Sequence, residues 1–596
     1  MKTKKIIALL MASMLAVSAF SACASQTESS SSEDGSSSAG TSEDSGVEED
    51  ASVAFGGVDS NGQYWDGEVE VSAPGEVPIV LDEAVTLSIF AVPHSDSCSK
   101  LDSSENEFTA KLEEATNIKL EWTLVTSADK TAKLNLLFQS NSYEDLIFNS
   151  YWDGATTYSY AEQGFLLPIS DYFDTQAYYY NIWKEAVISE GVTTEEALST
   201  NIMPDGKIYY LSSLNDAFNA KYATRLWIYQ PWLDTLGLEM PTTTEEFEEV
   251  LVAFKNEDPN GNGVADEIPL TGSTYGWNTD PTEHLMNSFV YYQKSDKMYL
   301  DDGEPTFVYT TEGYKDGVEW LSSLSEQGLL YQDTFTQDAN ALKSLTTQDV
   351  QLVGVTAGGI QSSFTTMVNG EDGDWVNWST VAPLEGPDGV QYARYTSVYP
   401  TSKVNITSNC EYPVVAFKLL DYLMEEEVGM EAINGEEDVY WEYAEEGLVD
   451  LEGGQALYTL IQTANANDTG NTNYAWLQIC HAYIFPGWHT LQSVVGDPAY
   501  DMESIIYQSA VTYEPYTPDV DMIVPSLIFE EDDATEMITL KMSLTETVDA
   551  FFTDAIVNGY SDEKWDAFQA ELELEQVDRV EELYLKAYNE YLDRLA

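Results

Sequence analysis

Short apolar segments alternate with helix-like segments in the first part of the chain. Val85–Phe90 has the composition of a buried strand, and Ile118–Val125 alternates apolar and polar residues as a strand does. Helices are predicted over 105–115 and 129–140, and Asp145–Asn149 is a third apolar strand. This order predicts an open, largely parallel sheet covered by helices. Since ligands bind such sheets at the carboxyl ends of strands, the loops after these three strands are candidate binding loops.

The same kind of pattern returns further along the chain. Leu226–Gln230 and Val350–Val355 are apolar enough for buried strands. The run 242–246 (TTTEE) contains a capping-box pattern, which opens a helix. Apolar residues at a helical period predict further helices over 311–327 and 413–424. At ~150 residues per domain, the length allows two to four domains or two large lobes.

The first fifty residues follow a different pattern. Met1–Lys5 is basic and Ile6–Phe20 is largely apolar, but the apolar stretch spans only ~22 Å as a helix, against ~30 Å of membrane hydrocarbon. This is typical of a secretory signal. Cys23 follows Ser-Ala, which resembles a bacterial lipobox whose cysteine becomes a lipidated N-terminus; an ordinary secreted protein with an incidental cysteine is the alternative. Residues 24–50 are mostly Ser, Glu, Asp and Gly, a composition that predicts an extended tether.

Composition limits the class of partner. There are 25 Lys and Arg residues against 103 Asp and Glu, a formal charge of −78. Binding to nucleic-acid phosphates needs clusters of cations, so nucleic acid is excluded as a partner, as is an anionic membrane surface. With 43% hydrophobic residues, the chain is too rich in core formers to be disordered throughout. Besides Cys23, the cysteines (Cys98, Cys410 and Cys480) form no CxxC pair, so they predict buried thiols with at most one bridge.

One segment, residues 258–267 (DPNGNGVADE), has the spacing of a calcium loop. Calcium takes six to eight oxygen ligands, and a glycine at the sixth position, here Gly263, permits the sharp turn. The expected ligands are the side chains of Asp258, Asn260, Asn262 and Asp266, the carbonyl of Val264, and Glu267 as a bidentate carboxylate. Pro269 occupies the position of the closing glutamate of an EF-hand, so the loop departs from that motif. A metal-free surface turn is the alternative; bound calcium would be structural.

The aromatic residues suggest a saccharide ligand. Sugars present apolar CH faces edged by hydroxyl groups, so their sites combine aromatic rings with short polar side chains. The candidate ligand-binding residues among the predicted loops are Trp152 and Asp153, Trp277 and Asn278, His94 and Asp96, and Trp441. Core packing is the alternative for each tryptophan. Arg394 could meet an acidic sugar, with a surface salt bridge as the alternative.

Segments spread over about residues 85–590 resemble, in order and spacing, the extracellular solute-binding proteins of bacterial ATP-driven importers. The resemblance is to the large carbohydrate-type lipoproteins of Gram-positive bacteria. The matching segments are Leu134–Phe148, Ala161–Tyr172, Asp205–Leu211, Leu226–Phe254, Asp258–Leu270, Gly328–Asp338 and Pro383–Val390.

The resemblance implies an α/β, two-lobe fold of mostly parallel sheets flanked by helices, with a hinge between the lobes. We expect a signal peptide over residues 1–22, a tether over 23–80 and the solute-binding fold over 81–596. The first lobe would comprise about 81–210 and 400–450, and the second about 211–399 and 451–596.

The same resemblance implies a monomer that holds an oligosaccharide between its lobes and delivers it to the permease subunits of an ABC importer. Its location would be the outer face of a Gram-positive cell membrane, through a lipid on Cys23. In relatives that bind alginate-type oligosaccharides the corresponding loop holds calcium.

Two other functions remain open. The chain has no Gly-x-Ser-x-Gly, His-Glu-x-x-His or phosphate-binding loop, which favours a binding protein over an enzyme. A surface glycoside hydrolase would need two carboxylates ~5–10 Å apart, and so acidic a chain always offers such a pair. A binding protein for peptides or another non-sugar solute would have the same fold and differ only in its cleft.

Overall fold

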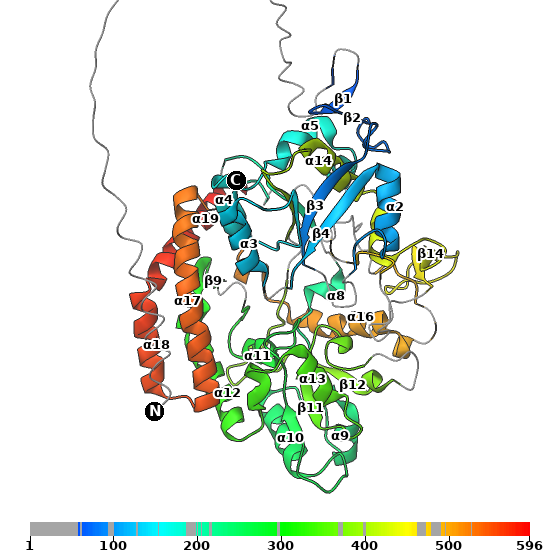
Figure 1. Ribbon diagram of the computed structural model, residues 1–596. Coiled ribbons are helices and arrows are strands. Elements are labelled where there is room, and N and C mark those ends of the chain that lie inside the picture. Colours follow the sequence, from blue (N-terminus) through cyan, green and yellow to red (C-terminus); the bar gives the residue numbers. More distant parts are fainter. Residues whose placement is uncertain are drawn as a thin grey trace, which may run out of the picture. The chain divides into compact units, whose positions relative to one another are not determined.

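The computed structural model describes residues 58–595 with gaps (Figure 1). The gaps are 60–61, 93–99, 127–128, 153, 186–197, 199–200, 204, 214–216, 295–297, 367–372, 397–400, 462–472, 478, 480–489, 495, 497, 526 and 528. The chain divides into two units at Glu49 and Asp50, and the first, Met1–Glu49, lies wholly outside the described residues. The expected signal peptide and Cys23 therefore lie outside them too, as do Cys98 and Cys480.

The first sheet has five strands in the order β4-β3-β5-β13-β6. Their bounds are β3 Val85–Ala91, β4 Ile118–Leu124, β5 Leu146–Phe148, β6 Leu211–Ser213 and β13 Thr401–Ile406. β3 runs parallel to β4 and β5, whereas β13 is antiparallel to β5 and β6. The predicted helices that follow its first strands are present as α2 (Glu107–Thr116) and α3 (Lys130–Ser140), and α14 (Pro413–Tyr422) packs near β13.

The second sheet has four strands in the order β12-β7-β11-β8. Their bounds are β7 Leu226–Tyr229, β8 Ile268–Leu270, β11 Val353–Ala357 and β12 Trp378–Val381. β11 is parallel to β8, and β7 is antiparallel to both β11 and β12. The predicted capping box opens α10 (Thr244–Asn256): Thr243 Oγ1 accepts from Glu246 N at 3.1 Å, while the Glu246 carboxylate accepts from Thr242 N at 2.9 Å.

The remaining elements connect and cover the two sheets. They are β1 Tyr64–Asp66, β2 Val69–Val71, α4 Gly154–Glu162, α5 Phe173–Gln176, α6 Tyr179–Lys184, α8 Phe218–Lys221, α9 Gln230–Leu236, α11 Pro281–Leu285, β9 Met298–Asp301, β10 Glu304–Phe307, α12 Glu312–Glu326, α13 Ala339–Thr346, α15 Glu426–Asn434, β14 Trp441–Tyr443, β15 Tyr458–Leu460, α16 Met502–Tyr513, α17 Glu531–Asn558, α18 Asp562–Leu574 and α19 Val577–Leu595, with short 3₁₀ turns between them.

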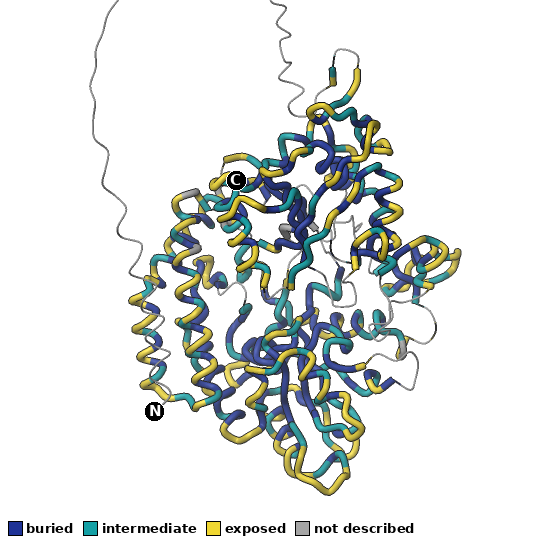
Figure 2. The backbone as a smooth tube through the Cα atoms, viewed as in Figure 1, coloured by how far each residue is buried: buried dark blue, intermediate teal, exposed yellow. Residues whose placement is uncertain are grey.

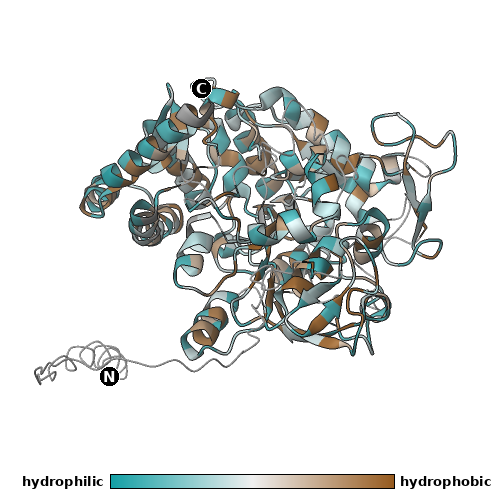
Figure 3. Cartoon of the chain, turned by 90° about the horizontal axis from the view of Figure 1, so that it is seen from above, coloured by the Kyte–Doolittle hydropathy of each residue, from teal (hydrophilic) through white to brown (hydrophobic). Residues whose placement is uncertain are grey.

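Each sheet has its own hydrophobic core. In Figure 2 the buried parts of the backbone follow the strands of each sheet. The first core joins the first sheet to α14, and the second joins the second sheet to α10, α12 and the C-terminal helices α17–α19. Figure 3 shows helices banded with hydrophilic and hydrophobic residues, as expected for helices that cover a core on one face. Among the described helices, none is long and apolar enough to cross a membrane.

The two-lobe α/β prediction is confirmed, with three corrections. Only the β4-β3-β5 and β11-β8 neighbours are parallel, so both sheets are mixed rather than mostly parallel. The tether cannot extend to residue 80, because β1 pairs with β2 and the first core contains Ile79 and Val80. The first lobe also extends beyond its expected bounds. It includes β6, Tyr458 and Trp476, because β6 belongs to the first sheet and the two aromatic residues belong to the first core. The chain thus crosses between the lobes after β6, before β13 and between Ile479 and α17.

Candidate functional site

The carboxyl edge of the second sheet carries an exposed tryptophan. Because β8 and β11 are parallel, the loop 271–280 after β8 and Gly359, two residues after β11, lie at the same edge. Trp277 in this loop is 60% exposed, and Tyr275 is 71% exposed. A Cβ added at Gly359 would lie 2.2 Å from Cζ3 of the Trp277 ring, so only glycine lets the indole pack against this backbone. The ring is therefore held in place while remaining open to solvent.

Asn278 has a supporting rather than an open position. Its backbone is left-handed, with φ of 52°, and its Oδ1 accepts a hydrogen bond from Thr224 Oγ1 at 3.1 Å. Thr224 Oγ1 in turn accepts from Arg394 Nη1 at 3.1 Å. Arg394 Nε lies 3.2 Å from Glu283 Oε1, and both side chains are largely buried. The salt-bridge alternative for Arg394 is thus confirmed, although the ion pair lies beneath the surface.

A buried arginine holds the glycine beneath Trp277. Arg225, just before β7, is 1% exposed, and its guanidinium donates to the carbonyls of Gly359 and Asn219. Asn219 Nδ2 also donates to Glu503 Oε2 at 3.3 Å. Burial raises the pKa of Glu503 to about 7, and the charges of Asp501 and Arg225 act in opposite directions on it. This network fixes the backbone on which the Trp277 ring rests.

The carboxyl edge of the first sheet also presents an aromatic ring. After β5, Asn149 and Tyr151 both have left-handed backbones, with φ of 57° and 48°. A bulky residue in this region is uncommon and costs roughly 1–3 kcal/mol, and such strain concentrates at functional sites. Tyr151 is 50% exposed, and Lys403 Nζ lies 2.5 Å from its hydroxyl and 4.5 Å from its ring centroid. Lys130 Nζ lies 5.8 Å from the same centroid.

The other ligand candidates divide into three groups. Trp152 is half-buried and packs against Tyr160, with ring centroids 4.8 Å apart. Asp153, His94 and Asp96 lie outside the described residues. The prediction that Trp441 binds the ligand is wrong. Its side chain is 0% exposed in the first core, and its Nε1 donates to Gly435 O at 3.0 Å. Its ring has no surface left for a solute.

The sequence reasoning missed Tyr151, Tyr275 and Lys403. Tyr151 directly precedes Trp152 and follows a predicted strand, so its position was a usable signal. Lys403 approaches it from β13, which is 252 residues away along the chain, and no local pattern indicates that contact.

The predicted calcium loop is tightly turned. Gly261 and Gly263 have φ of 69° and 76°, and Gly263 N donates to Asp258 Oδ2 at 3.1 Å. Asp266 Oδ1 accepts from the Asn262 amide at 3.0 Å and from the Asn260 amide at 3.3 Å. These contacts close the loop around oxygen-bearing side chains.

Two oxygen atoms of this loop have the environment that a bound cation would suit. Asp258 Oδ1 and Glu267 Oε1 are buried and have no hydrogen-bond partner. Burial and the charges of Asp258 and Asp266 raise the pKa of Glu267, which a cation would reverse. Val264 is exposed, so its carbonyl lies on a surface turn. Within the part of the chain that the structure describes, no three His, Cys, Asp or Glu side chains are already gathered around one point for a metal.

A buried histidine beneath the site should make stability depend on pH. His284 on α11 is 5% exposed, its Nδ1 lies 3.3 Å from Tyr513 Oη, and burial lowers its pKa to about 4. The unfolded chain, with a histidine pKa of about 6.5, binds the proton more readily, so the contribution of His284 is complete above about pH 6.5 and is lost as pH falls toward 4. The full loss is about 3 kcal/mol, from about 1.4 kcal/mol per pKa unit.

Urea unfolding of the wild type and His284→Gln at several values between pH 7.5 and 4.5 checks this. We expect the wild type to lose stability relative to the variant as pH falls. The difference between the two proteins is the relevant quantity, because Glu503 and Asp66, whose pKa values are raised to about 7 and about 6, act in the opposite direction. Parallel stability curves for the two proteins would refute a neutral buried His284.

Comparison with known proteins adds the family. Residues 107–435, more than half of the chain, match the bacterial extracellular solute-binding proteins. The chain belongs to this family. The fructooligosaccharide ABC transporter substrate-binding protein FusA of Streptococcus pneumoniae is 27% identical over 529 residues, which cover 86% of this chain and 92% of FusA.

Solved structures of this family share the two-lobe fold. FusA in complex with kestose is 23% identical, with a TM-score of 0.68 over 85% of this chain and 100% of FusA. A FusA EF-hand mutant in complex with fructo-nystose has the same TM-score at 22% identity and the same coverage. The alginate-binding protein AlgQ2 without calcium ion has a TM-score of 0.64 at 16% identity, over 86% of this chain and 100% of AlgQ2.

Proposed function

We propose that this protein is the substrate-binding component of an ABC importer and captures an oligosaccharide between its two lobes. The observation that carries the proposal is the Trp277 ring, 60% exposed yet packed on Gly359 at the carboxyl edge of a sheet. Such a fixed, open ring is suited to stacking on the CH face of a sugar. Tyr151 offers a second half-exposed ring at the corresponding edge of the first sheet. The similarity to FusA, a fructooligosaccharide-binding protein, supports a saccharide as the solute.

Capture by two lobes requires contacts from each of them. We propose that Tyr151 and Trp152 contact the solute from the first lobe. We also propose Asp153, His94 and Asp96 as ligand-binding residues; these three lie outside the described residues. Trp277 is on the second lobe, and Asn278 positions its loop through Thr224. A solute that contacts both sets binds the closed form better than the open form, so it shifts the equilibrium toward closure. The closed protein then docks on the permease subunits and releases the sugar chemically unchanged.

We further propose that the protein is a monomer lipidated on Cys23 and held at the outer face of a Gram-positive cell membrane. The basic and apolar start of the chain, Ser-Ala before Cys23 and the acidic, serine-rich segment that follows support this anchor. Cell fractionation tests the lipid anchor. We expect the wild type in the membrane fraction and Cys23→Ala outside it.

Calcium is proposed as a structural ion in the 258–267 loop. Asp258, Asn260, Asn262, Asp266 and Glu267 would supply side-chain oxygens and Val264 its carbonyl. Bound calcium would supply charge neutralisation, which the buried, unpartnered oxygens of Asp258 and Glu267 lack. The similarity to FusA, for which an EF-hand mutant structure exists, is consistent with this role.

Calorimetric titration with neutral and acidic oligosaccharides and with peptides tests the proposed function. We expect saturable, one-to-one binding of an oligosaccharide. Binding of peptides but no glycan would replace the sugar assignment with the peptide alternative. Chromatography of the bound sugar after prolonged incubation distinguishes the hydrolase alternative, because hydrolysis would yield shorter products.

Tyr151 should contribute to affinity without contributing to stability. Tyr151→Gly removes the ring and also relieves the left-handed backbone, which costs other residues about 1 kcal/mol relative to glycine. We expect affinity for the bound oligosaccharide to fall roughly tenfold, a value typical of one truncated binding side chain. The melting temperature should stay close to that of the wild type, because the relieved backbone strain offsets the lost contact between Lys403 and the Tyr151 hydroxyl. Tyr443→Ala, which removes a 43% exposed tyrosine of β14, is the control, and equal affinity in both variants would exclude Tyr151 from the site.

A further inference from the structure

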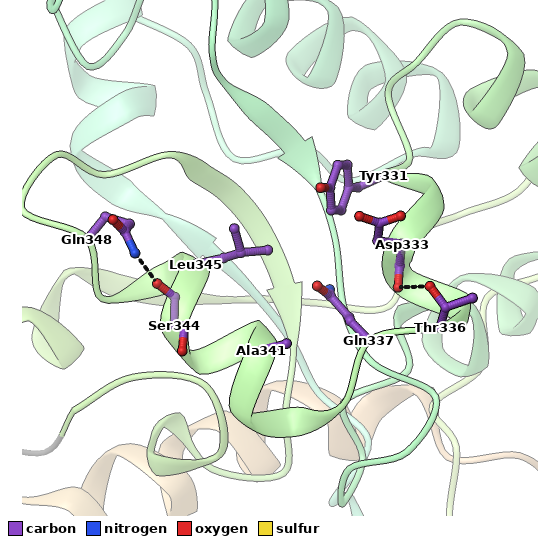
Figure 4. Close-up of a pocket in the computed structure, with 8 residues that line it drawn as sticks. All are labelled: Tyr331, Asp333, Thr336, Gln337, Ala341, Ser344, Leu345 and Gln348. Atoms are coloured by element: carbon purple, nitrogen blue, oxygen red, sulfur yellow. Dashed lines mark hydrogen bonds between the residues drawn. The ribbon is translucent and has the colours of Figure 1, made fainter.

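An open pocket on the second lobe is not used by the residues described above. Its volume is about 590 Å³, within the range of small-molecule sites. The lining residues are Tyr331, Asp333, Thr336, Gln337, Ala341, Ser344, Leu345 and Gln348. Figure 4 shows Tyr331 and Asp333 on one side of the pocket, facing Leu345 and Ser344 of α13 on the other.

The pocket opens at the same edge of the sheet as the Trp277 loop. Leu330 forms a parallel bridge with Leu270, the last residue of β8, and Tyr331 N donates to Leu270 O at 2.9 Å. The chain therefore leaves the sheet at Tyr331 in the same direction as it does after β8. Carboxyl edges of this kind are where open α/β sheets bind ligands.

Direct contacts join the pocket wall to the loop 271–280. Gln337 Nε2 donates to Thr271 Oγ1 at 3.0 Å and to Gly272 O at 2.6 Å, and Gln337 O accepts from Ser273 Oγ at 2.8 Å. A Cβ added at Gly276 would lie 3.1 Å from the Cβ of Ala339, the first residue of α13. The wall of the pocket is thus in direct contact with the loop that carries the exposed rings.

The lining chemistry suits an uncharged sugar unit. Tyr331 provides a half-buried ring and Leu345 an apolar contact, while Gln348 and the hydroxyl of Ser344 provide polar groups. The Nε2 of Gln337 is already engaged by the loop 271–280. None of the eight lining residues is a cation, and Asp333 is an anion, so a carboxylate-bearing or phosphorylated unit would be repelled.

We propose that this pocket binds an additional unit of a neutral oligosaccharide whose neighbouring part stacks on Trp277. The inference rests on the proposed function and extends it, because it assigns a neutral solute longer than the Trp277 site alone would need. Longer oligosaccharides should therefore bind more tightly than short ones, and the gain should depend on the pocket residues.

A calorimetric length series tests this, with kestose, nystose and a longer inulin-type fructan as probes. For Tyr331→Ala and Gln348→Ala we expect affinity for the longest fructan to fall five- to tenfold, with less than a twofold change for kestose. Gln348 is exposed, so that variant should fold normally, and Tyr443→Ala is the control for loss of a surface tyrosine. Equal losses at every length, or no loss in either variant, would overturn the pocket assignment while leaving the proposed function standing.

Two other outcomes are informative. If the wild type binds none of the fructans and no other neutral glycan, both the pocket assignment and the proposed neutral oligosaccharide fail together. If galacturonan oligomers gain affinity with length and lose that gain in Tyr331→Ala, the pocket binds an acidic sugar and the neutral class is wrong.

Discussion

Trp277→Ala is expected to weaken oligosaccharide binding by about 30-fold or more, the effect of losing a central aromatic contact worth about 2 kcal/mol. The melting temperature should change little, because the side chain is 60% exposed and packs mainly on the backbone of Gly359. Calorimetric titration and thermal unfolding of the same preparations check both parts.

Gly359→Ala provides the matched test of ring placement. The added Cβ would lie 2.2 Å from the indole, so the ring must move although Trp277 itself is unchanged. We expect a loss of affinity in the same direction, whereas Tyr443→Ala should bind as the wild type does. Unchanged affinity in Trp277→Ala would remove the observation on which the proposed function rests.

Calcium removal is expected to lower the melting temperature of the wild type by roughly 5–10 °C. An ion present at one hundred times its Kd stabilises a folded protein by about 2.7 kcal/mol, and each kcal/mol shifts the melting temperature by about 2–4 °C in a domain of about 150–250 residues, the scale of one lobe. The expected cause is the loss of the charge that the buried oxygens of Asp258 and Glu267 need. Thermal unfolding with calcium or with a chelator measures the shift.

The double variant Asp258→Ala, Asp266→Ala should not respond to calcium. Glu245→Ala, Glu249→Ala removes the same charge from the exposed face of α10, the preceding helix, and should keep the full response. An equal response in the wild type and in the loop variant would refute the metal assignment. If both double variants lose the calcium-dependent rise in melting temperature to the same extent, that rise comes from the net charge of the protein and not from the 258–267 loop.

Local patterns were enough to find most elements of both lobes. The helix predicted over 311–327 is present as α12, because Tyr314, Val318, Leu321 and Leu324 recur at a helical period and all face the second core. The capping box likewise fixed the start of α10. Strand directions could not be predicted in the same way. β7 and β13 join their sheets after the chain has crossed between the lobes, and the sequence of a single strand does not indicate whether it runs parallel or antiparallel to its neighbours.

The candidate site was only partly predictable for the same reason. Trp277 and Trp441 both stood in predicted irregular segments, yet one is 60% exposed and the other is 0% exposed in the first core. Trp441 is buried in a core that also contains Tyr458 and Trp476, and no local pattern indicates that these segments join the first lobe. The proposed calcium loop needed no such information, because all its proposed ligands are local; the bound calcium itself stays a prediction.

Closure of the two lobes on one solute can be measured by small-angle X-ray scattering, with and without saturating oligosaccharide. The wild type should become more compact when the sugar binds, because residues of both lobes contact it. At a sugar concentration of about ten times the wild-type Kd, Trp277→Ala should be mostly unbound and keep most of the scattering of the free protein. Calorimetric saturation of the wild type without any change in its radius of gyration would contradict capture between the lobes.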